Sequence, residues 1–245
     1  EIGYQGITIN LGNGPRAQKP LGQDSRVRRA FEAALDRQAM VDVVYAGLFT
    51  PSVQAVPQTS PFYVPDVKPP GRDLAKAKAL LKEAGVTLPV QVTLTVPNNP
   101  DIRQMAEVIQ AMTGEAGFDV KLNVMEFASS LDAETRGDFE AYMLQWSGRV
   151  DADGNMTQFF RTGASNNHQK YSNPAVDALL DRARATSEVA ERRSIYAQMW
   201  PLLRQDLPII YLYSQKNLAG MSTRVGGFRP VPDGMIRLQG LTLAP

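Results

Sequence analysis

Four side chains that can bind polar groups lie close together in residues 145–155 (QWSGRVDADGN). Trp146 offers a broad aromatic face, and Arg149 offers a planar guanidinium that suits a carboxylate or a phosphate. Asp151 and Asp153 offer carboxylates that accept hydrogen bonds from an ammonium group. Each residue also has a structural interpretation: Trp146 as core at a strand end, Arg149 as an ion-pair partner of the aspartates, and the aspartates as helix caps. We predict a ligand site here and leave these alternatives open.

Two further side chains are candidates for ligand contact. Tyr171 stands where a polar stretch passes into a helix, and Asn10 is a polar residue on an otherwise apolar strand. The structural alternatives are a packed loop-to-helix junction for Tyr171 and a hydrogen bond to the backbone for Asn10. Both stay candidate ligand-binding residues on the sequence alone.

Two features that suggest a metal site lack the residues that such a site requires. Residues 151–155 (DADGN) resemble the start of a calcium loop. An EF-hand requires Gly at its sixth position and Glu at its twelfth, where this chain has Met156 and Thr162. The single histidine, His168, lies in a polar stretch without a second His or Cys nearby, so we expect it to be solvated at the surface. We therefore predict no metal site and no cofactor.

An enzyme is the main competing class of function. Asp151 and Asp153 are close enough in sequence to act as the paired carboxylates of a hydrolase. The sequence supplies no nucleophile elbow, phosphate-binding loop or set of metal ligands to accompany them, and it has no cysteine. We predict a binding protein rather than an enzyme.

Composition further narrows the class of protein and its possible partners. Of the 245 residues, 43% are hydrophobic and 21% are charged, which is typical of a globular domain. The net charge of +1 gives no broad basic surface, so we expect no nucleic acid partner. No apolar run approaches the roughly 20 residues that span a bilayer. The absence of cysteine suits an oxidising compartment, and the start at Glu1 without a signal peptide suggests a processed product or an excised piece.

Alternating strands and helices should position the candidate residues. Apolar residues at every second position predict strands, and apolar residues three or four apart predict helices. The expected strands cover 3–11, 90–96, 118–124, 140–146 and 208–213, and the expected helices cover 24–35, 40–47, 73–85, 102–112, 173–183 and 189–206. Pro201 should kink or divide the last helix, and the proline-rich residues 50–71 should form a long surface loop.

The order of these elements predicts an α/β fold. The strand 90–96, the helix 102–112 and the strand 118–124 follow one another at the spacing of a βαβ unit. The two strands should therefore be parallel, with a right-handed crossover. From Ser214 onward the chain should be extended and rich in loops.

Five segments in this order resemble a known family. They are DSRVRRAFEAALDRQAMVDVVYAG (24–47), DLAKAKALLKEAG (73–85), MLQWSGRVDADGNMTQFF (143–160), YSNPAVDALLDRAR (171–184) and ERRSIYAQMWPLLRQDLPIIYLY (191–213). Together they resemble the family 5 extracellular solute-binding proteins of peptide, nickel and glutathione importers. The resemblance implies a periplasmic-binding-protein-like lobe of type II, with a mixed sheet that contains the βαβ unit and is flanked by helices.

The resemblance also implies how the chain is divided. The matched segments belong to the C-terminal half of such receptors. Residues 1–12 would then be a hinge or crossing strand, 13–213 the C-terminal ligand-binding lobe, and 214–245 a segment that returns toward an N-terminal lobe. These receptors close two lobes over a solute. The N-terminal lobe, which is missing from this chain, is therefore an expected partner.

The implied function is that of the substrate-binding component of an ABC importer. Such a protein captures a peptide or another small solute and delivers it to a membrane permease, in the periplasm or at an extracytoplasmic lipid anchor. In peptide-binding members a residue like Trp146 is followed three positions later by an Asp that pairs with the α-ammonium of the peptide, and here that position is Arg149. Either Asp151 or Asp153 takes that role, or the ligand presents an anionic or sugar-like group. A module that docks a membrane sensor is a third alternative.

Overall fold

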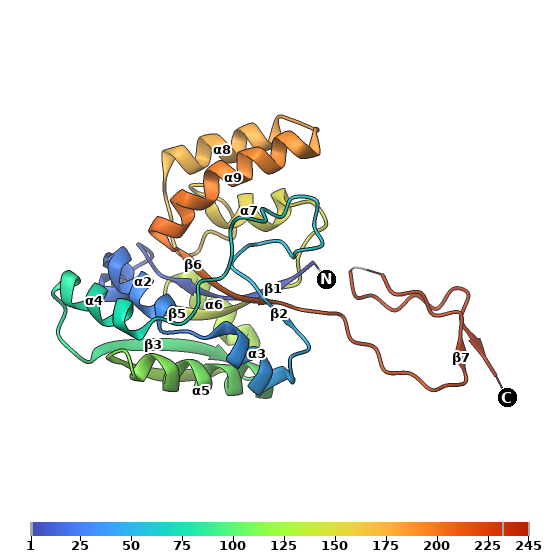
Figure 1. Cartoon of the computed structure of the whole chain (residues 1–245), viewed down its shortest axis with the longest axis horizontal. Coiled ribbons are helices and arrows are strands. Elements are labelled where there is room, and N and C mark those ends of the chain that lie inside the picture. The colour runs from blue at the N-terminus through green and yellow to red at the C-terminus, as the bar shows by residue number, and fades with distance from the viewer. Residues whose placement is uncertain (1, 232, 245) are drawn as a thin grey trace.

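The computed structural model describes residues 2–231 and 233–244 and is built on a six-stranded mixed sheet (Figure 1). The strand order is β2-β6-β1-β5-β3-β4. The strands are β1 Tyr4–Ile9, β2 Thr50–Pro51, β3 Val90–Pro97, β4 Phe118–Met125, β5 Ala141–Trp146 and β6 Ile209–Ser214. Strand β1 is antiparallel to β5 and β6, whereas β3 is parallel to β4 and β5. The predicted mixed sheet and the parallel pair of the βαβ unit are confirmed.

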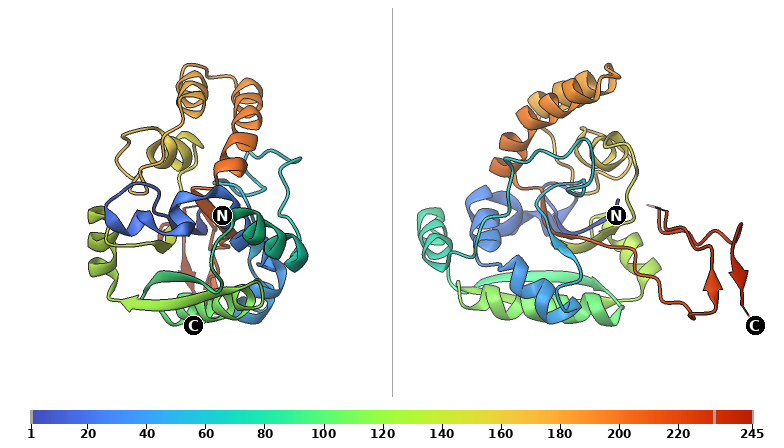
Figure 2. Two further views of the ribbon diagram at one scale, coloured as in Figure 1. Left: turned by 90° about the vertical axis from the view of Figure 1, so that its left-hand side faces the viewer. Right: turned by 45° about the vertical axis from the view of Figure 1, so that its right-hand side comes forward.

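Helices cover both faces of this sheet (Figures 1 and 2). On one side lie α1 Pro20–Gln23, α2 Ser25–Ala33, α3 Arg37–Tyr45, α4 Leu74–Ala84 and α5 Pro100–Gly114. On the other side lie α7 Asp153–Phe160, α8 Pro174–Arg184 and α9 Val189–Asp206. The short helix η1 Pro15–Gln18 precedes α1, and α6 Phe127–Arg136 connects β4 to β5.

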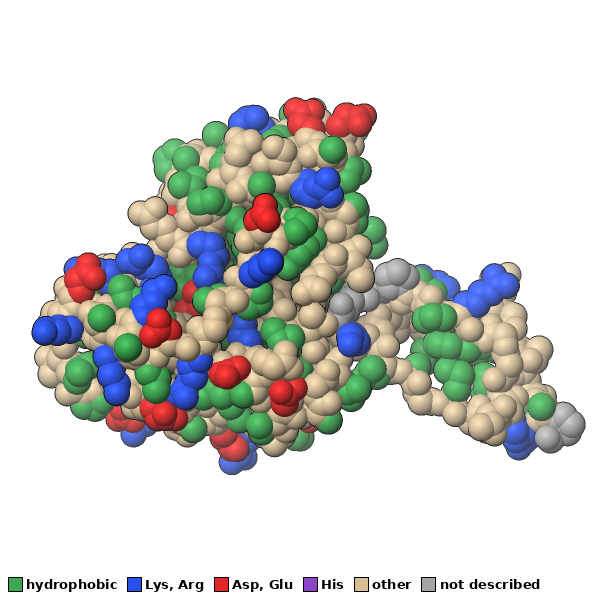
Figure 3. All heavy atoms as spheres, in the orientation of Figure 1, with side chains coloured by type: hydrophobic (Ala, Val, Ile, Leu, Met, Phe, Trp, Pro, Cys, Tyr) green, Lys and Arg blue, Asp and Glu red, His purple; other side chains and the backbone are tan. Residues whose placement is uncertain are grey.

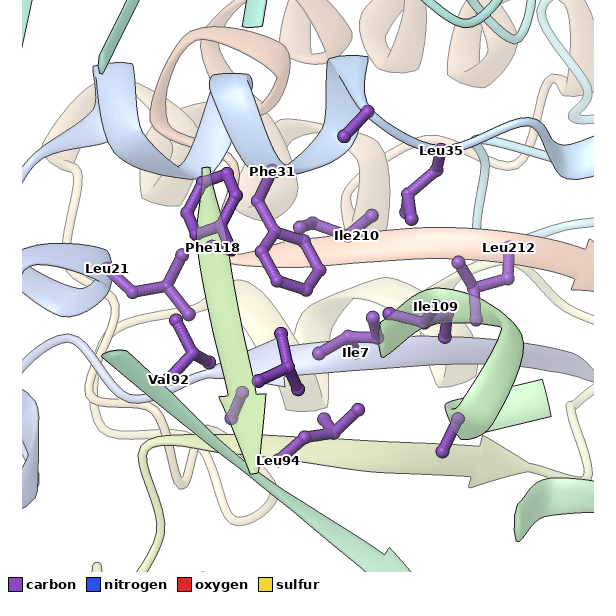
Figure 4. Close-up of a cluster of buried hydrophobic side chains, with 14 of the residues drawn as sticks. Ile7, Leu21, Phe31, Leu35, Val92, Leu94, Ile109, Phe118, Ile210 and Leu212 are labelled. Atoms are coloured by element: carbon purple, nitrogen blue, oxygen red, sulfur yellow. The ribbon is translucent and has the colours of Figure 1, made fainter. Parts of the chain in front are cut away.

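Two hydrophobic cores follow from the alternation of side chains along the central strands. In β5, Ala141 and Met143 belong to the core under α2–α5, whereas Tyr142 and Leu144 belong to the core under α7–α9. Successive residues of a strand point to opposite faces, so a strand that is covered on both faces is apolar throughout. Figure 4 shows the first core, where Ile7 and Ile210 of the sheet meet Phe31 of α2 and Ile109 of α5.

Side-chain caps begin the helices that the sequence predicted. Asp24 accepts a hydrogen bond from the backbone N–H of Arg26 at the start of α2, at 2.8 Å. Asp73 caps α4, and Asn173 caps α8 with Pro174 as the first helical residue. Each carboxylate or amide satisfies an N–H group that the helix itself leaves unpaired.

The proline-rich segment 50–71 differs from the prediction of a surface loop. After the short strand β2, residues 52–56 are all buried, and Ala55, Val56, Phe62 and Val64 pack into the core under α7–α9. The prediction was wrong because residues that alternate with prolines carry no helical or strand periodicity, although their apolar side chains can still be buried.

Three details of the elements also differ. Helix α9 is continuous through Pro201, so the division does not occur, and the alternative of a kink stays a prediction. The helix predicted over 40–47 begins earlier and ends earlier, as α3, with Ala46 as its C-cap in a left-handed conformation at φ 49°. Val124, predicted to face the core, is 40% exposed, because β4 is the edge strand of the sheet and is buried only in its first half.

The C-terminal segment leaves the sheet after Ser214 and extends away from the rest of the molecule (Figures 1 and 2). It carries a short hairpin of β7 Val225–Gly226 and β8 Thr242–Leu243. Apolar side chains gather on this segment, as Figure 3 shows. Those that are largely exposed are Leu218, Met221, Met235, Ile236, Leu238 and Leu243. Within the described residues, no helix has both the length and the apolar character needed to cross a membrane.

Candidate functional site

Trp146 is the last residue of β5, and the chain turns from there into α7. Its ring is partly buried and packs edge-to-face on Phe159 of α7, with 5.0 Å between the ring centroids. The indole N–H donates to the side-chain oxygen of Asn155, at 2.8 Å. The ring is therefore fixed by one aromatic contact and one hydrogen bond, and part of its surface stays open to a ligand.

Asn155, which the sequence analysis missed, holds this turn together. Its side chain is fully buried. Its Oδ1 accepts from the indole of Trp146 and from the backbone N–H of Arg149 at 2.7 Å, and its amide donates to the carbonyl of Arg149 at 2.9 Å. The only signal in the sequence was a polar residue at a position of α7 that faces the core, one turn before Phe159.

Arg149 is exposed and lies on the face of Trp146, with its guanidinium carbon 4.5 Å from the ring centroid. Its Nη1 donates to the carbonyl of Gly148 at 2.7 Å. Among the described residues no carboxylate lies within ion-pair distance of it, so the predicted local pairing with Asp151 or Asp153 does not form. The guanidinium keeps donors available for a carboxylate or a phosphate.

Two glycines allow Arg149 to take this position. Gly148 adopts φ 82°, and a Cβ there would lie 1.9 Å from the carbonyl oxygen of Ile2. Gly154 begins α7 beneath the arginine, where a Cβ would lie 2.7 Å from the Cγ of Arg149. Glycine tolerates both the left-handed backbone and the close approach.

Asp151 is held by Arg192 of α9. The two side chains form a bidentate pair, with N–O distances of 2.5 and 2.8 Å, and Asp151 also accepts the N–H of Asp153 at 2.9 Å. Hydrogen bonds from Arg192 lower the pKa of Asp151 despite partial burial. The guanidinium of Arg192 lies 4.5 Å from the centroid of the Phe62 ring, so it is fixed on two sides.

Asp153 stands in the first turn of α7. It accepts a hydrogen bond from the hydroxyl of Thr157 at 2.5 Å and lies 3.5 Å from the Nε of Arg184. Both aspartates thus have protein partners, but neither caps α7, whose N-cap residue Ala152 makes no side-chain cap hydrogen bond. Their contact with a ligand stays a prediction.

A cavity of about 460 Å³ opens beside Trp146. Its apolar lining comes from Phe127 and Leu131 of α6, Leu144 and Trp146 of β5, and Phe159 of α7. Its polar lining comes from Glu134, Gln145, Ser147, Asn166, His168 and Gln215. Such a mixture of apolar walls and a few polar groups is typical of small-molecule sites.

His168 corrects one prediction. It was expected to be solvated, but its side chain is only 23% exposed and its Nδ1 lies 3.4 Å from the carboxylate of Glu134. The prediction was wrong because the polar residues around it fold against α6 and α7: the Asn13 amide donates to the backbone carbonyl of His168, and the Asn166 amide donates to the side chain of Gln158.

Other hollows lie on the surface, and one of about 270 Å³ is lined in part by Arg149 and Val150. One of about 470 Å³ is polar and lined by Arg149, Asp151, Asp153, Arg184 and Arg192 among others. A larger one of about 570 Å³ lies between the start of α3 and the proline-rich segment and includes none of the predicted site residues. We place the candidate ligand site in the cavity of Trp146, because a fixed aromatic ring lines it together with several polar groups. Arg149 lies on that ring and lines the hollow of about 470 Å³.

Tyr171 and Asn10 are both buried and engaged within the protein. The hydroxyl of Tyr171 donates to Asp206 at the end of α9, at 2.6 Å. The amide of Asn10 donates to the carbonyls of Asn13 and Phe139, each at 2.8 Å, and its oxygen accepts the N–H of Asn13. These contacts match the structural alternatives for both residues, and a role in ligand contact stays a prediction.

Comparison with known proteins decides the family. The profile of the bacterial extracellular solute-binding proteins, family 5 middle region, matches residues 1–168. The chain belongs to this family. A solved structure, HbpA2 from Haemophilus parasuis, superposes with a TM-score of 0.83 at 28% sequence identity, over 100% of this chain and 48% of that one. The predicted periplasmic-binding-protein-like fold is confirmed.

Two curated relatives show what this family 5 chain resembles. A dipeptide-binding protein of Pseudomonas aeruginosa is 29% identical over 235 residues, which cover 93% of the chain and 44% of the relative. A probable deoxycholate-binding periplasmic protein of Escherichia coli is 29% identical over 222 residues, which cover 86% of the chain and 41% of the relative. The chain therefore spans less than half the length of these relatives.

Proposed function

We propose that this chain is the ligand-binding lobe of a solute receptor, which captures a peptide or another small solute in the cavity beside Trp146 and delivers it to the membrane permease of an ABC importer. The observation that carries the proposal is this cavity, with a fixed aromatic ring at its wall and an arginine without a carboxylate partner on that ring. Membership of the family supports a binding role rather than an enzymatic one. The periplasm is the proposed compartment, as in the E. coli relative.

The proposal includes a second lobe. Residues 1–12 and 214–245 would connect this lobe, residues 13–213, to the remainder of a receptor about twice as long, in keeping with the length of the relatives. The exposed apolar side chains of the C-terminal segment support this, because a contiguous apolar surface is normally covered by a partner. A ligand in the open cavity would be enclosed only when the other lobe closes over it.

Arg149 supports a ligand that carries a carboxylate. A dipeptide and deoxycholate each carry one, and these are the ligands in the names of the two relatives. A guanidinium forms two parallel hydrogen bonds with a carboxylate, and the ring beneath it limits its motion. Of the two alternatives, this interpretation favours a ligand whose anionic group binds Arg149 over a ligand whose ammonium group binds Asp151 or Asp153.

Calorimetric titration of the intact receptor tests the proposal. The probes are the dipeptide Ala-Phe and its C-terminal amide, which differ by the carboxylate. We expect Arg149→Ala to weaken Ala-Phe binding by about 1–3 kcal/mol, the range for a hydrogen bond to a charged group, with little effect on the amide. Trp146→Ala should weaken both probes, because both lose the aromatic contact.

The control for this titration is Arg103→Ala, which removes an exposed arginine of α5 that pairs only with Glu107. It should leave both affinities unchanged. Unchanged affinity in Trp146→Ala would place the ligand elsewhere and contradict the proposal.

A further inference from the structure

Glu134 is a buried carboxylate in the wall of the Trp146 cavity. It lies in the last turns of α6, and its side chain is 6% exposed. The partner of this carboxylate among the described residues is His168, whose Nδ1 lies 3.4 Å away. That distance exceeds the usual N–H···O range of roughly 2.7–3.2 Å, so the contact satisfies little of the carboxylate's capacity to accept hydrogen bonds.

The surroundings of Glu134 favour the binding of a further hydrogen-bond donor to its carboxylate. The cavity that Glu134 lines also has apolar walls, from Phe127, Leu131, Leu144 and Phe159. A carboxylate in an apolar setting is costly unless it is paired, and it interacts strongly with any cation that reaches it.

Neighbouring tyrosines respond to the same charge. Burial is the main cause that raises the pKa of Tyr142 to about 12, and the charge of Glu134 raises it further. Burial likewise raises the pKa of Tyr4, again with a contribution from Glu134. The electric field of the Glu134 carboxylate thus reaches the hydrophobic core under α7–α9, which contains both tyrosines.

We propose that Glu134 binds a positively charged group of the ligand, an ammonium or a guanidinium carried on an apolar or aromatic body that fills the cavity. This inference rests on the proposed function and names its class of ligand. Trp146 borders both charges: it lines the cavity together with Glu134 and carries Arg149 on its ring. Arg149 itself lines another hollow, of about 470 Å³, so a ligand that also carries a carboxylate would have to extend past the Trp146 ring to reach it.

An NMR titration of the complete 245-residue chain tests this assignment. The probes are phenethylammonium and 2-phenylethanol, which share the aromatic body and differ in charge. The cation should bind up to about tenfold more tightly than the alcohol, since a hydrogen bond to a charged group exceeds a neutral one by about 1–1.5 kcal/mol. Glu134→Gln should remove this preference and leave the binding of 2-phenylethanol unchanged. The matched control is Asp132→Asn, which removes an exposed carboxylate from the same helix and should keep the preference.

The outcomes separate the two proposals. If Trp146→Ala abolishes binding of both probes but Glu134→Gln keeps the preference for the cation, the cavity binds solutes and the role of Glu134 is wrong. If neither probe perturbs the cavity, both proposals are wrong. His168→Ala provides a second variant, and it should keep or strengthen the preference because it frees Glu134. Loss of the preference in His168→Ala but not in Glu134→Gln would overturn the assignment.

Discussion

At the scale of single residues, the surroundings decide which charged groups are available to a ligand. Arg149 and Asp151 stand two positions apart, and the sequence predicts either as an anchor. The fold brings Arg192 to Asp151, where it forms a bidentate pair, whereas Arg149 keeps its donors. The partner of Asp151 lies 41 residues away in sequence, so local spacing cannot reveal it.

The same limit explains why the sequence analysis missed two residues of the candidate site. Asn155 and Glu134 are common residue types at ordinary helical positions. Their roles depend on burial and on contacts made by tertiary structure, with Trp146 in one case and with His168 in the other. The sequence singles out Trp146 and Arg149 as candidates because they lie at and just after a strand end in a recognisable family segment, and their contact with a ligand stays a prediction.

Glu140 is a second buried carboxylate, and its role is structural. It is 4% exposed, and its Oε2 accepts the backbone N–H of Thr93 at 2.8 Å, while its Oε1 has no hydrogen-bond partner among the residues that the structure describes. Burial raises the pKa of Glu140, and the Thr93 N–H and the charges of Lys19 and Arg16 offset this only in part.

The raised pKa gives a prediction for stability against pH. A folded-state pKa above that of the unfolded chain means that the folded state binds the proton more tightly. The stabilisation from this proton is present below the unfolded pKa, about 4.3 for Glu, and is lost as the pH rises through the folded pKa. We expect Glu140→Gln to gain stability relative to the wild type as the pH rises from about 4.3 toward neutrality.

Chemical denaturation at a series of pH values measures this difference. Glu107→Gln, which changes an exposed carboxylate of α5, is the control and should show no such trend. A difference between Glu140→Gln and the wild type that is independent of pH would contradict the prediction.

At the scale of elements, most helices and strands could be predicted because their signals are local. Caps such as Asp24 and Asp73 and the alternation of β3 lie within a few residues of the elements that they define. The segment 50–71 could not be predicted, because Gln54 fixes it through contacts ten and more residues away. Its amide donates to the carbonyls of Val64 and Val67 at 2.8 and 2.9 Å, and its oxygen accepts the N–H of Val64.

Gln54→Ala tests this organisation. The variant removes three hydrogen bonds of a fully buried side chain. It leaves the backbone N–H of Val64 without this partner, whereas the carbonyl of Val64 still accepts the N–H of Val67 at 3.1 Å. At about 1 kcal/mol for each bond, with a further penalty for unpaired groups, we expect a loss of about 2–4 kcal/mol in the free energy of unfolding.

Urea denaturation measures that loss, and limited proteolysis should show faster cleavage within 50–71. Gln38→Ala removes an exposed glutamine that bonds only to Asp42 and should change neither result. Equal stability and equal cleavage in Gln54→Ala would show that the segment is held by its apolar contacts alone.

At the scale of the whole molecule, the account depends on a second lobe. The fold, the family and the two-sided burial of the central sheet follow from the sequence pattern, whereas the division at residues 12 and 213 stays a proposal. The open cavity beside Trp146 and the exposed apolar C-terminal segment both fit a surface that another lobe covers. A closed cleft would hold a ligand far more tightly than this lobe alone, because closure roughly doubles the contacts and excludes water.

The central claim, that this is a solute-binding lobe, is tested most directly by native mass spectrometry. The intact receptor, purified without added ligand, is measured beside this 245-residue chain and beside intact Trp146→Ala. We predict a small-molecule mass on the intact receptor that disappears on denaturation and is absent from the chain and from the variant. The same adduct on Trp146→Ala, or equal retention by the chain alone, would contradict the account.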